Sequence, residues 1–306
     1  MIDVRAANDR ETTEWFDGWR QRILTWYGSC RASDAWIAGE VQRRLTIPDG
    51  AVWATHVLAV GDAQVGFMTT RLAPYGPATI AGIVDIWVEP ARRRQGIGTA
   101  ARQWAEDWAR SQRRPLLLAT DPRNEAAEAL FRTYPVRFQS MLKPLGPVAA
   151  PADGLVPRPM REPELDRLLD AAMRSFAAST ADSGLLGPDD AKGRARAQFG
   201  PQLSSGLSTE GNSFWTLDLG PDPVASIWLR HSTPAETSFV CYVQVDEAFR
   251  GRGLGRAAMQ FAERVSVEAG DTYLGLSVFG ANTVAVNLYT RLGYATVEQG
   301  RSVGAA

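Results

Sequence analysis

Residues 239–259 read FVCYVQVDEAFRGRGLGRAAM, and residues 274–294 read LGLSVFGANTVAVNLYTRLGY. The first segment runs an apolar strand into an arginine- and glycine-rich loop, after which apolar residues recur at helical spacing. Because glycine has no Cβ, Gly253 and Gly255 can adopt turn geometries that other residues avoid and can let a ligand approach the backbone. The unpaired N–H groups and the positive dipole end of the following helix point into the same loop. The pattern therefore predicts an anion-binding loop, most naturally for a pyrophosphate.

Two common phosphate-binding patterns do not fit this loop. A dinucleotide-binding GxGxxG pattern counted from Gly251 would need a third glycine where the chain has Arg256. A P-loop would need lysine followed by serine or threonine after its final glycine, and the chain has arginine and alanine there. Residues 250–255 instead match RxxGxG, and residues 282–294 match NxxAxxLYxxxGY.

The same combination occurs once more, earlier in the chain. RxxGxG recurs around Gly96, which lies 157 residues before Gly253. NxxAxxL recurs from Asn124, which lies 158 residues before Asn282, but it ends on Phe131 where the second copy has tyrosine. A repeat of this length predicts two copies of one α/β domain in tandem.

The length of 306 residues suits two domains of about 150 residues, each able to bury its own core. Prolines concentrate over residues 144–159, as in an extended linker. We therefore predict a first domain over residues 1–148, a proline-rich linker over residues 149–158 and a second domain over residues 159–306.

Apolar periodicity and turn residues predict the other elements. In the first copy we expect strands at residues 2–6, 56–60, 64–72, 79–88 and 116–120, and helices at residues 12–27, 33–45 with Ser33 as N-cap, 97–108 and 124–134. In the second copy we expect helices at residues 162–179 and 191–199 and strands at residues 213–219 and 224–230, ahead of the opening stretch.

Composition sets limits on partners and compartment. The 45% apolar and 22% charged content is that of an ordinary soluble protein, and a net charge of −1 gives no overall attraction to nucleic acid or anionic membranes. The two cysteines, Cys30 and Cys241, make no disulfide framework. Because the N-terminus lacks a signal-peptide core and no apolar run could span a membrane, we expect a cytoplasmic protein. His56 and His231 lack acidic or cysteine neighbours at ligand spacing, so we expect no metal.

On the RxxGxG loops and the NxxAxxLY pattern, the chain resembles the GNAT superfamily of acyl-CoA-dependent N-acyltransferases. The resemblance implies two mixed α/β domains that use acetyl-CoA as co-substrate. The tandem layout is similar to that of mycothiol synthases within the superfamily. The family forms its acceptor site partly from its first two helices; we expect the tryptophan face of residues 15–26 in the core, with an acceptor groove or inter-domain contact as the second interpretation.

Carried over position by position, the resemblance implies a set of coenzyme A contacts in each copy. The second copy would use Val243, Val245, Arg250, Gly251, Arg252, Gly253, Leu254, Gly255, Arg256, Asn282 and Tyr289. The first copy would use Val88, Arg93, Arg94, Gln95, Gly96, Ile97, Gly98, Thr99 and Asn124. Backbone N–H groups of residues 240–245 and 84–88 would meet the thioester oxygen, often at a β-bulge.

The resemblance also implies an acid and a base. Tyr289 lies where the family commonly places the acid that protonates the leaving thiolate, and Phe131 replaces it in the first copy. The family often takes its base from the strand before the loop; the first copy has Asp85 there, whereas the nearest carboxylate of the second copy is Glu236. Cys241 and Glu298 are further candidates in the second copy.

Because Tyr289 belongs to the second copy, we expect catalysis there, with the first copy binding CoA without turnover or serving a structural role. The expected activity is transfer of an acetyl group from acetyl-CoA to a primary amine of a small molecule, by direct attack in a ternary complex. The alternative is a non-catalytic acyl-CoA-binding or scaffolding protein, since each copy lacks one expected group. We expect a monomer or a homodimer.

Overall fold

The computed structural model of the chain describes residues 2–147, 154–203, 205–232 and 236–304. Its first half follows the predicted elements, with boundaries that differ by a few residues. The elements are β1 Asp3–Ala6, α1 Asp9–Gly28, α2 Asp34–Leu45, β2 Val52–Val60, β3 Ala63–Tyr75, β4 Ala78–Val88, α3 Ile97–Ser111, β5 Leu116–Thr120, α4 Glu125–Phe131 and β6 Val136–Pro144. Ser33 caps α2 as expected, because its side chain accepts the N–H of Trp36.

The second half repeats this order of elements. They are β7 Leu155–Pro159, α5 Glu162–Asp182, α6 Pro188–Phe199, β8 Asn212–Leu219, β9 Asp222–Arg230, β10 Thr237–Val245, α7 Leu254–Glu268, β11 Tyr273–Phe279, α8 Thr283–Arg291 and β12 Ala295–Val303. Within the described ranges, the eight α-helices and twelve strands thus form two copies of one pattern.

Sequence analysis missed three strands. β6 and β12, the last strand of each half, carry no expected element, and β7 overlaps the end of the residues predicted as linker. Residues 155–158 of the predicted linker belong to this strand, which pairs with β8. Residues 148–153 of the predicted linker lie outside the described residues.

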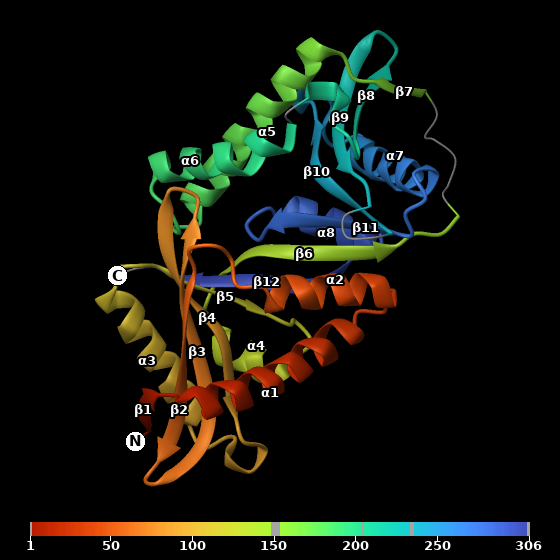
Figure 1. Cartoon of the computed structure of the whole chain (residues 1–306). Coiled ribbons are helices and arrows are strands. Elements are labelled where there is room, and N and C mark those ends of the chain that lie inside the picture. Colours follow the sequence, from red (N-terminus) through yellow and green to blue (C-terminus); the bar gives the residue numbers. More distant parts are fainter. Residues whose placement is uncertain (1, 148–153, 204, 233–235, 305–306) are drawn as a thin grey trace.

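The strands form one continuous sheet in which the two halves exchange their last strands (Figure 1). The order is β1-β2-β3-β4-β5-β12-β6-β11-β10-β9-β8-β7. β12, from the end of the chain, pairs with β5 of the first half, while β6 pairs with β11 of the second half. β12 and β6 also pair with each other. Each half of the sheet is therefore completed by a strand that comes from the other half of the chain.

A cation on each exchanged strand forms an ion pair in the half that receives the strand. Lys143 of β6 lies 2.7 Å from the buried Glu263 of α7. Arg301 of β12 is buried and lies 2.6 Å from Glu128 of α4, and it also donates to the backbone carbonyls of Phe131 and Tyr134. Buried charges are costly unless paired, so these contacts favour the exchanged arrangement over any other register of the two strands.

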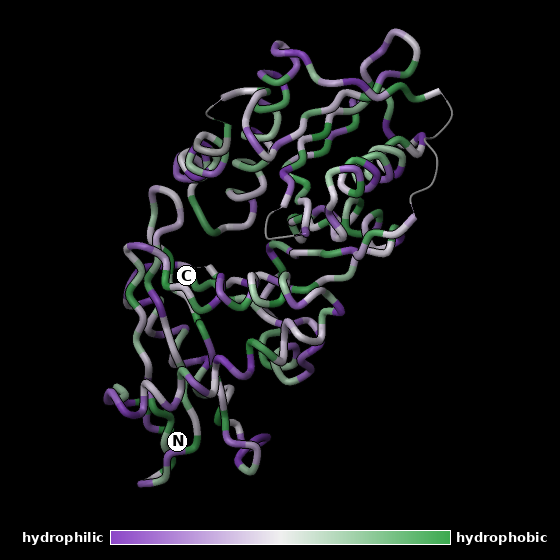
Figure 2. Tube along the Cα trace, turned by 45° about the vertical axis from the view of Figure 1, so that its right-hand side comes forward, coloured by the Kyte–Doolittle hydropathy of each residue, from purple (hydrophilic) through white to green (hydrophobic). Residues whose placement is uncertain are grey.

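Helices cover both faces of the sheet. α3 and α4 pack over the first half on one face, and α7 and α8 pack over the second half on that same face. α1, α2, α5 and α6 lie on the opposite face. Successive side chains of β6 point to opposite faces of the sheet and so reach both layers of helices. Met141 packs in the core under α7, and its neighbour Leu142 packs under α1 and α2. Apolar segments accordingly follow the strands and the sides of the helices that meet them (Figure 2).

The tryptophan face of α1 is buried in this core, as expected. Trp15 and Trp19 are stacked with ring centroids 5.2 Å apart, and both contact Trp53 of β2. Trp26 is only partly buried, and Tyr27 is the fully buried residue at that end of the helix. The register of α1 is thus rotated slightly from the one that the sequence predicts.

Because the last strands are exchanged, a chain cut between Pro147 and Gly154 is expected to remain one particle. The two fragments would share the backbone ladders of β6 with β11 and of β12 with β5. A protease site inserted there and cleaved to completion should leave one size-exclusion peak at the position of the 33.4-kDa chain, which resolves into two only in denaturant. Two half-sized peaks in native buffer would contradict the exchange.

Candidate active site

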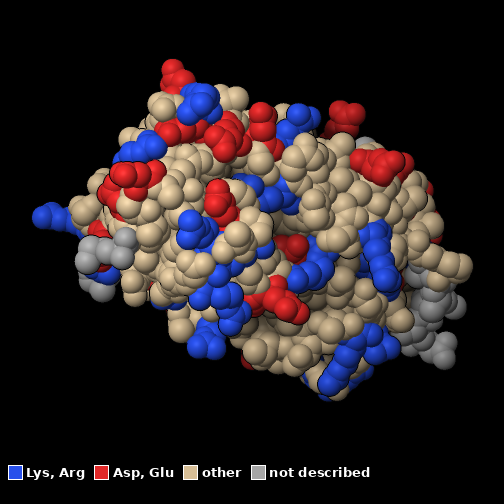
Figure 3. Space-filling model, turned by 90° about the horizontal axis from the view of Figure 1, so that it is seen from below, with Lys and Arg blue, Asp and Glu red and all other residues tan. Residues whose placement is uncertain are grey.

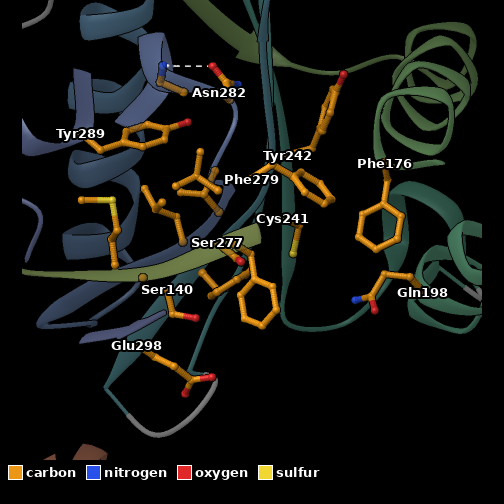
Figure 4. Close-up of a pocket in the computed structure, with 18 of the residues that line it drawn as sticks. Ser140, Phe176, Gln198, Cys241, Tyr242, Ser277, Phe279, Asn282, Tyr289 and Glu298 are labelled. Atoms are coloured by element: carbon orange, nitrogen blue, oxygen red, sulfur yellow. Dashed lines mark hydrogen bonds between the residues drawn. The ribbon is translucent and has the colours of Figure 1, made fainter. Parts of the chain in front are cut away.

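A cleft of about 1860 Å³ lies on the face of the sheet that carries α2, α5 and α6, and it extends through the sheet to the loop before α7. Both halves line it. The second half contributes residues of β10, α7, β11 and α8, and the first half contributes residues of α2, β3 and β6. Figure 4 shows Tyr289 of α8 on one side of β10 and Phe176 of α5 on the other, with Ser140 of β6 and Ser277 of β11 nearby.

The glycine loop of the second half opens into this cleft. Gly251 and Gly253 have φ angles of +77° and +80°, a region that favours glycine, and Gly253 is the N-cap of α7. A Cβ added at either position would meet nothing within 4 Å, so the backbone there is free for a ligand to approach. The Nε of Arg250 donates to the carbonyl of Val245 at 3.3 Å and so fixes the start of the loop. The N–H groups at the start of α7 are thus suited to bind an anion.

Most of the coenzyme contacts predicted for the second half line the cleft. Val243, Val245, Arg250, Gly251, Gly253, Leu254, Gly255, Arg256, Asn282 and Tyr289 do so. Arg252 does not: its guanidinium lies over the ring of Phe249. Asn282 is the N-cap of α8 and accepts the N–H of Ala285 at 3.1 Å, which orients the helix that carries Tyr289 (Figure 4).

The first half has the same loop conformation in a different position. Gly96 has a φ angle of +82° and caps α3, and Arg94 takes a φ angle of +63° where the second half has Gly251. The Nε of Arg93 donates to the carbonyl of Val88, as Arg250 does to Val245. The nine coenzyme contacts predicted for the first half do not line the cleft described above.

Strand β10 separates from β11 at the cleft. The two strands pair in parallel only from Thr237 to Val240, and the β10–β9 register shifts between Val240 and Tyr242. Beyond this bulge, the β10 backbone groups that face β11 lack a strand partner. Such groups are suited to meet a developing negative charge, which is the role expected for residues 240–245. In the first half β4 and β5 diverge in the same way after Ile83.

Tyr289 is buried in the core of the second half and lines the cleft. Burial raises the pKa of its hydroxyl to about 12, so the group is protonated at neutral pH. Figure 4 shows the hydroxyl pointing away from α8 towards the space beside β10. Phe131 occupies the corresponding place in the first half and packs in the core under α3 and α4.

Two of the predicted catalytic carboxylates lie away from the cleft. Asp85 accepts the indole N–H of Trp15 at 3.1 Å and forms an ion pair with Arg22 of α1, so it holds α1 against β4. Glu236 is exposed in the turn before β10, and its carbonyl accepts the N–H groups of Thr272 and Tyr273. Neither residue lines the cleft described above.

Glu298, by contrast, lines the cleft from the exchanged strand β12. Its Oε2 accepts the hydroxyl of Tyr27 and lies 3.0 Å from Arg43 and from Arg44 of α2. Burial opposes ionisation of this carboxyl, but Arg44 and Arg43 outweigh it and lower its pKa. Glu298 is therefore a carboxylate at neutral pH, and it joins the first two helices to the last strand.

Cys241 lies at the bulge and lines the cleft. Burial raises the pKa of its thiol to about 12. Because the thiolate is the nucleophilic form, Cys241 is not activated for covalent catalysis. Within the described ranges, no group of three His, Cys, Asp or Glu residues could hold a metal ion.

Charge in the cleft is predominantly positive. Its described lining includes nine arginines and two glutamates, Glu40 and Glu298. Three of these arginines belong to the loop and the helix ends beside it, namely Arg250, Arg256 and Arg291, and the others surround the wider part of the cleft. On the face of the molecule seen from below, Lys and Arg side chains and Asp and Glu side chains lie intermingled around a hollow (Figure 3).

Glu298→Gln is expected to lower the free energy of unfolding by about 3 kcal/mol at pH 7, because it leaves Arg44, whose side chain is only 15% exposed, without a countercharge. The folded state lowers the pKa of Glu298, so its stabilisation is present above the unfolded value of about 4.3 and is lost as the pH falls through the folded pKa. The difference in free energy of unfolding between Glu298→Gln and the unchanged chain, measured by denaturant unfolding, should therefore shrink below about pH 4.

Glu40→Gln is the control for this change. Among the described residues Glu40 pairs only with Arg43, whose side chain is 53% exposed, so loss of this carboxylate should cost below about 1 kcal/mol. Equal destabilisation by the two variants would contradict the role given to Glu298.

Comparisons with known proteins agree with this architecture. The model of the "Acetyltransferase (GNAT) family" matches residues 16–134 and again residues 173–294. A mycothiol acetyltransferase of Nocardia farcinica is 31% identical over 267 residues, which cover 79% of this chain and 80% of that protein. An uncharacterized N-acetyltransferase of Bacillus subtilis, YdgE, is 29% identical over 140 residues, 44% of this chain and 88% of that protein.

A solved structure shares the fold of the whole chain. It is a GCN5-related N-acetyltransferase from Sphaerobacter thermophilus, with 17% identity and a TM-score of 0.59, and the match covers 99% of this chain and 96% of that one. The described helices include none long and apolar enough to cross a membrane. With two matched regions that together span most of its length, this chain belongs to the GNAT family of acetyltransferases and carries the GNAT domain twice in tandem.

Proposed function

We propose that the second half transfers an acetyl group from acetyl-CoA to a primary amine of a small molecule, by direct attack in a ternary complex. The observation that carries this proposal is that the glycine loop, the β10 bulge and Tyr289 line one cleft, together with the carboxylate of Glu298. The similarity to a mycothiol acetyltransferase over most of both chains supports a small-molecule acceptor.

The residues of the second half fit acetyl-CoA. The space beside Gly251 and Gly253 and the free N–H groups of α7 suit its pyrophosphate, and Arg250 and Arg256 add positive charge. When bound, acetyl-CoA supplies the acetyl group as a thioester. The backbone N–H groups of β10 beyond Val240 would orient its carbonyl and stabilise negative charge on the carbonyl oxygen.

Two side chains would handle protons. The hydroxyl of Tyr289 would donate its proton to the leaving sulfur, and its raised pKa of about 12 keeps that proton in place at neutral pH. An alkyl ammonium has a pKa near ~10 and must lose a proton before it attacks. We propose that Glu298, which is ionised and lines the cleft, faces the ammonium and directs this proton to water, because its lowered pKa makes it too weak a base to keep the proton itself.

The first half is proposed to act as a scaffold that completes the acceptor side of the cleft. It supplies the walls formed by α2 and β3 and the strand β6. Its own loop is preserved, but Phe131 replaces the tyrosine and Asp85 is held by Arg22. The division of the chain into domains over residues 1–148 and 159–306 stays a prediction. This division does not include the exchange of β6 and β12 between the two halves of the sheet.

Initial-rate kinetics test the proposal. Release of the CoA thiol from acetyl-CoA is followed with a panel of small amines while both substrates are varied. Intersecting double-reciprocal lines are expected, because both substrates must be bound before transfer. Parallel lines would indicate a covalent acetyl-enzyme and would overturn direct attack. Tight acetyl-CoA binding without release on any amine would favour the alternative, a non-catalytic acyl-CoA-binding protein.

A further inference from the structure

A row of polar side chains crosses the sheet from the point where β10 and β11 separate to Glu298. The two strands pair last at Val240 and Leu276, and Ser277 is the next residue of β11. Ser277 is the direct cross-strand partner of Ser140 on β6, and Ser140 is the direct partner of Glu298 on β12. Because direct partners stand side by side on one face of a sheet, the three side chains follow one another across three neighbouring strands (Figure 4).

The polar groups of this row are accessible from the cleft. Ser277 is exposed and Ser140 is half-buried, and both line the cleft together with Glu298. Neither serine hydroxyl has a hydrogen-bond partner among the described residues. The contacts of Glu298 with α1 and α2 all go to its Oε2, so its Oε1 is left to accept a hydrogen bond from water in the cleft.

The spacing of the row suits bridging water rather than direct contact. Neighbouring strands lie about 4.8 Å apart, so the backbones at Ser277 and Glu298 are separated by about 10 Å. An amine that attacks a thioester held between β10 and β11 would lie beside Ser277, and a direct hydrogen bond to Glu298 would need a separation of about 3 Å. Two hydroxyls with water between them can span the remaining distance.

The first half lacks the beginning of this row. β4 and β5 pair last at Ile83 and Leu118, and the next residue of β5 is Ala119. Ala119 lies 158 residues before Ser277, the same offset that relates the two N-cap asparagines of the repeat. The first half therefore lacks both the tyrosine and the hydroxyl at the separation of its strands, whereas the second half has both.

From this geometry we propose that Ser277 and Ser140 are positioning residues that hold water between the attacking amine and Glu298, and that the proton of the ammonium leaves along this row. An N–H bond of the ammonium breaks as water at Ser277 accepts the proton, and the nitrogen keeps the electron pair with which it attacks. The proton then passes through water at Ser140 to water beside Glu298 and into the cleft.

Glu298 supplies the negative charge at the far end of the row. Its charged and titratable neighbours are Tyr27 of α1, Arg43 and Arg44 of α2 and Arg71 of β3. The inference rests on the proposed function, because it concerns the proton that must leave before the amine attacks.

The pH dependence of Ser277→Ala tests this path. The amine of the panel with the highest kcat/KM is assayed by release of the CoA thiol between pH 6 and pH 10. At pH 7 the amine is charged, and the variant should lower kcat/KM about 10-fold. As the pH approaches the amine pKa near ~10, the neutral amine enters without needing the path, and the difference should shrink below about 3-fold. An equal loss at every pH, or no loss at pH 7, overturns the inference.

Three further variants assign the effect to the row. Ser140→Ala should show the same dependence on pH, and Ser277→Thr, which keeps a hydroxyl, should lose less than about 3-fold at pH 7. Ser175→Ala is the matched control, because Ser175 of α5 is exposed and lines the cleft outside the row. It should match the unchanged chain at every pH. A pH-dependent loss of the same size in Ser175→Ala overturns the role of the row.

Calorimetric titration with acetyl-CoA separates this inference from the proposed function. Ser277→Ala should bind acetyl-CoA with the affinity of the unchanged chain, because the row is assigned to the amine and not to the coenzyme. A 10-fold loss of that affinity would place Ser277 at the coenzyme and overturn the inference. Failure of the unchanged chain to turn over any amine overturns the proposed function and the inference with it. Turnover with a Ser277→Ala loss that does not vary with pH overturns the inference alone.

Discussion

Tyr289→Phe is expected to lower kcat about 100-fold while the affinity for acetyl-CoA stays nearly constant. The change removes one hydroxyl from a buried ring and leaves the packing against Tyr294, whose ring centroid lies 5.9 Å away. Loss of a general acid typically costs two to four orders of magnitude in rate, and about 100-fold is the lower end of that range. Single-turnover kinetics and calorimetric titration with acetyl-CoA measure the two quantities separately.

Tyr242→Phe is the matched control for this change. Tyr242 also lines the cleft, but its hydroxyl donates to the side-chain carbonyl of Gln244 at 3.1 Å. Its loss should change kcat by less than about 3-fold, since the hydroxyl forms a neutral hydrogen bond with a neighbouring side chain and is not assigned a proton transfer. Unchanged kcat in Tyr289→Phe would remove the reason for assigning the acid to α8.

The pH profile gives an independent check on Tyr289. The neutral phenol is the active form, and burial raises its pKa to about 12, so the hydroxyl stays protonated through the whole range in which the protein can be assayed. kcat should therefore show no alkaline decline due to Tyr289 between pH 7 and about pH 10. A decline in that range that disappears in Tyr289→Phe would contradict the assignment.

Gly253→Glu is expected to abolish acetyl-CoA binding. The φ angle of +80° costs a residue with a Cβ roughly 1–2 kcal/mol. The larger effect is that a carboxylate would enter the open space in front of the α7 N-terminus, where the pyrophosphate is proposed to lie. Calorimetric titration of the CoA-stripped protein should show one site per chain before the change and no site after it.

Gly220→Glu controls for the strain. Gly220 has a φ angle of +62° in the turn between β8 and β9, and a Cβ there would also meet nothing within 4 Å. The Gly220→Glu variant should unfold at a temperature close to that of Gly253→Glu and should still bind acetyl-CoA. Two sites per chain in the original protein, one of which survives Gly253→Glu, would show that the loop around Gly96 also binds and would contradict the role of the first half as a scaffold.

The sequence by itself determined the local parts of this molecule. The two glycine loops and the N-cap Ser33 were predicted, and the structure has them at those residues. Each depends on a few neighbouring residues, because a turn needs glycine at a positive φ angle and a cap needs a side-chain acceptor three residues before an N–H. The repeat then implied that two such units follow one another.

Only the tertiary structure decided how the two units combine. β6 contains Arg137, Gln139, Ser140 and Lys143, and β12 contains Glu298 and Arg301, so neither reads as a strand buried in the middle of a sheet. Their polar residues are explained by partners distant in the sequence, such as Glu263 for Lys143. Local periodicity carries no information on such partners, and the exchange of the two strands was therefore not predictable.

Partners distant in the sequence also decide which residues line the candidate site. Sequence patterns predicted coenzyme contacts mainly from one loop and one helix, but among the carboxylates they favoured Asp85 and Glu236 and gave Glu298 only as a further candidate. The sheet order brings Glu298 to the cleft, holds Asp85 against α1 and leaves Glu236 in an exposed turn.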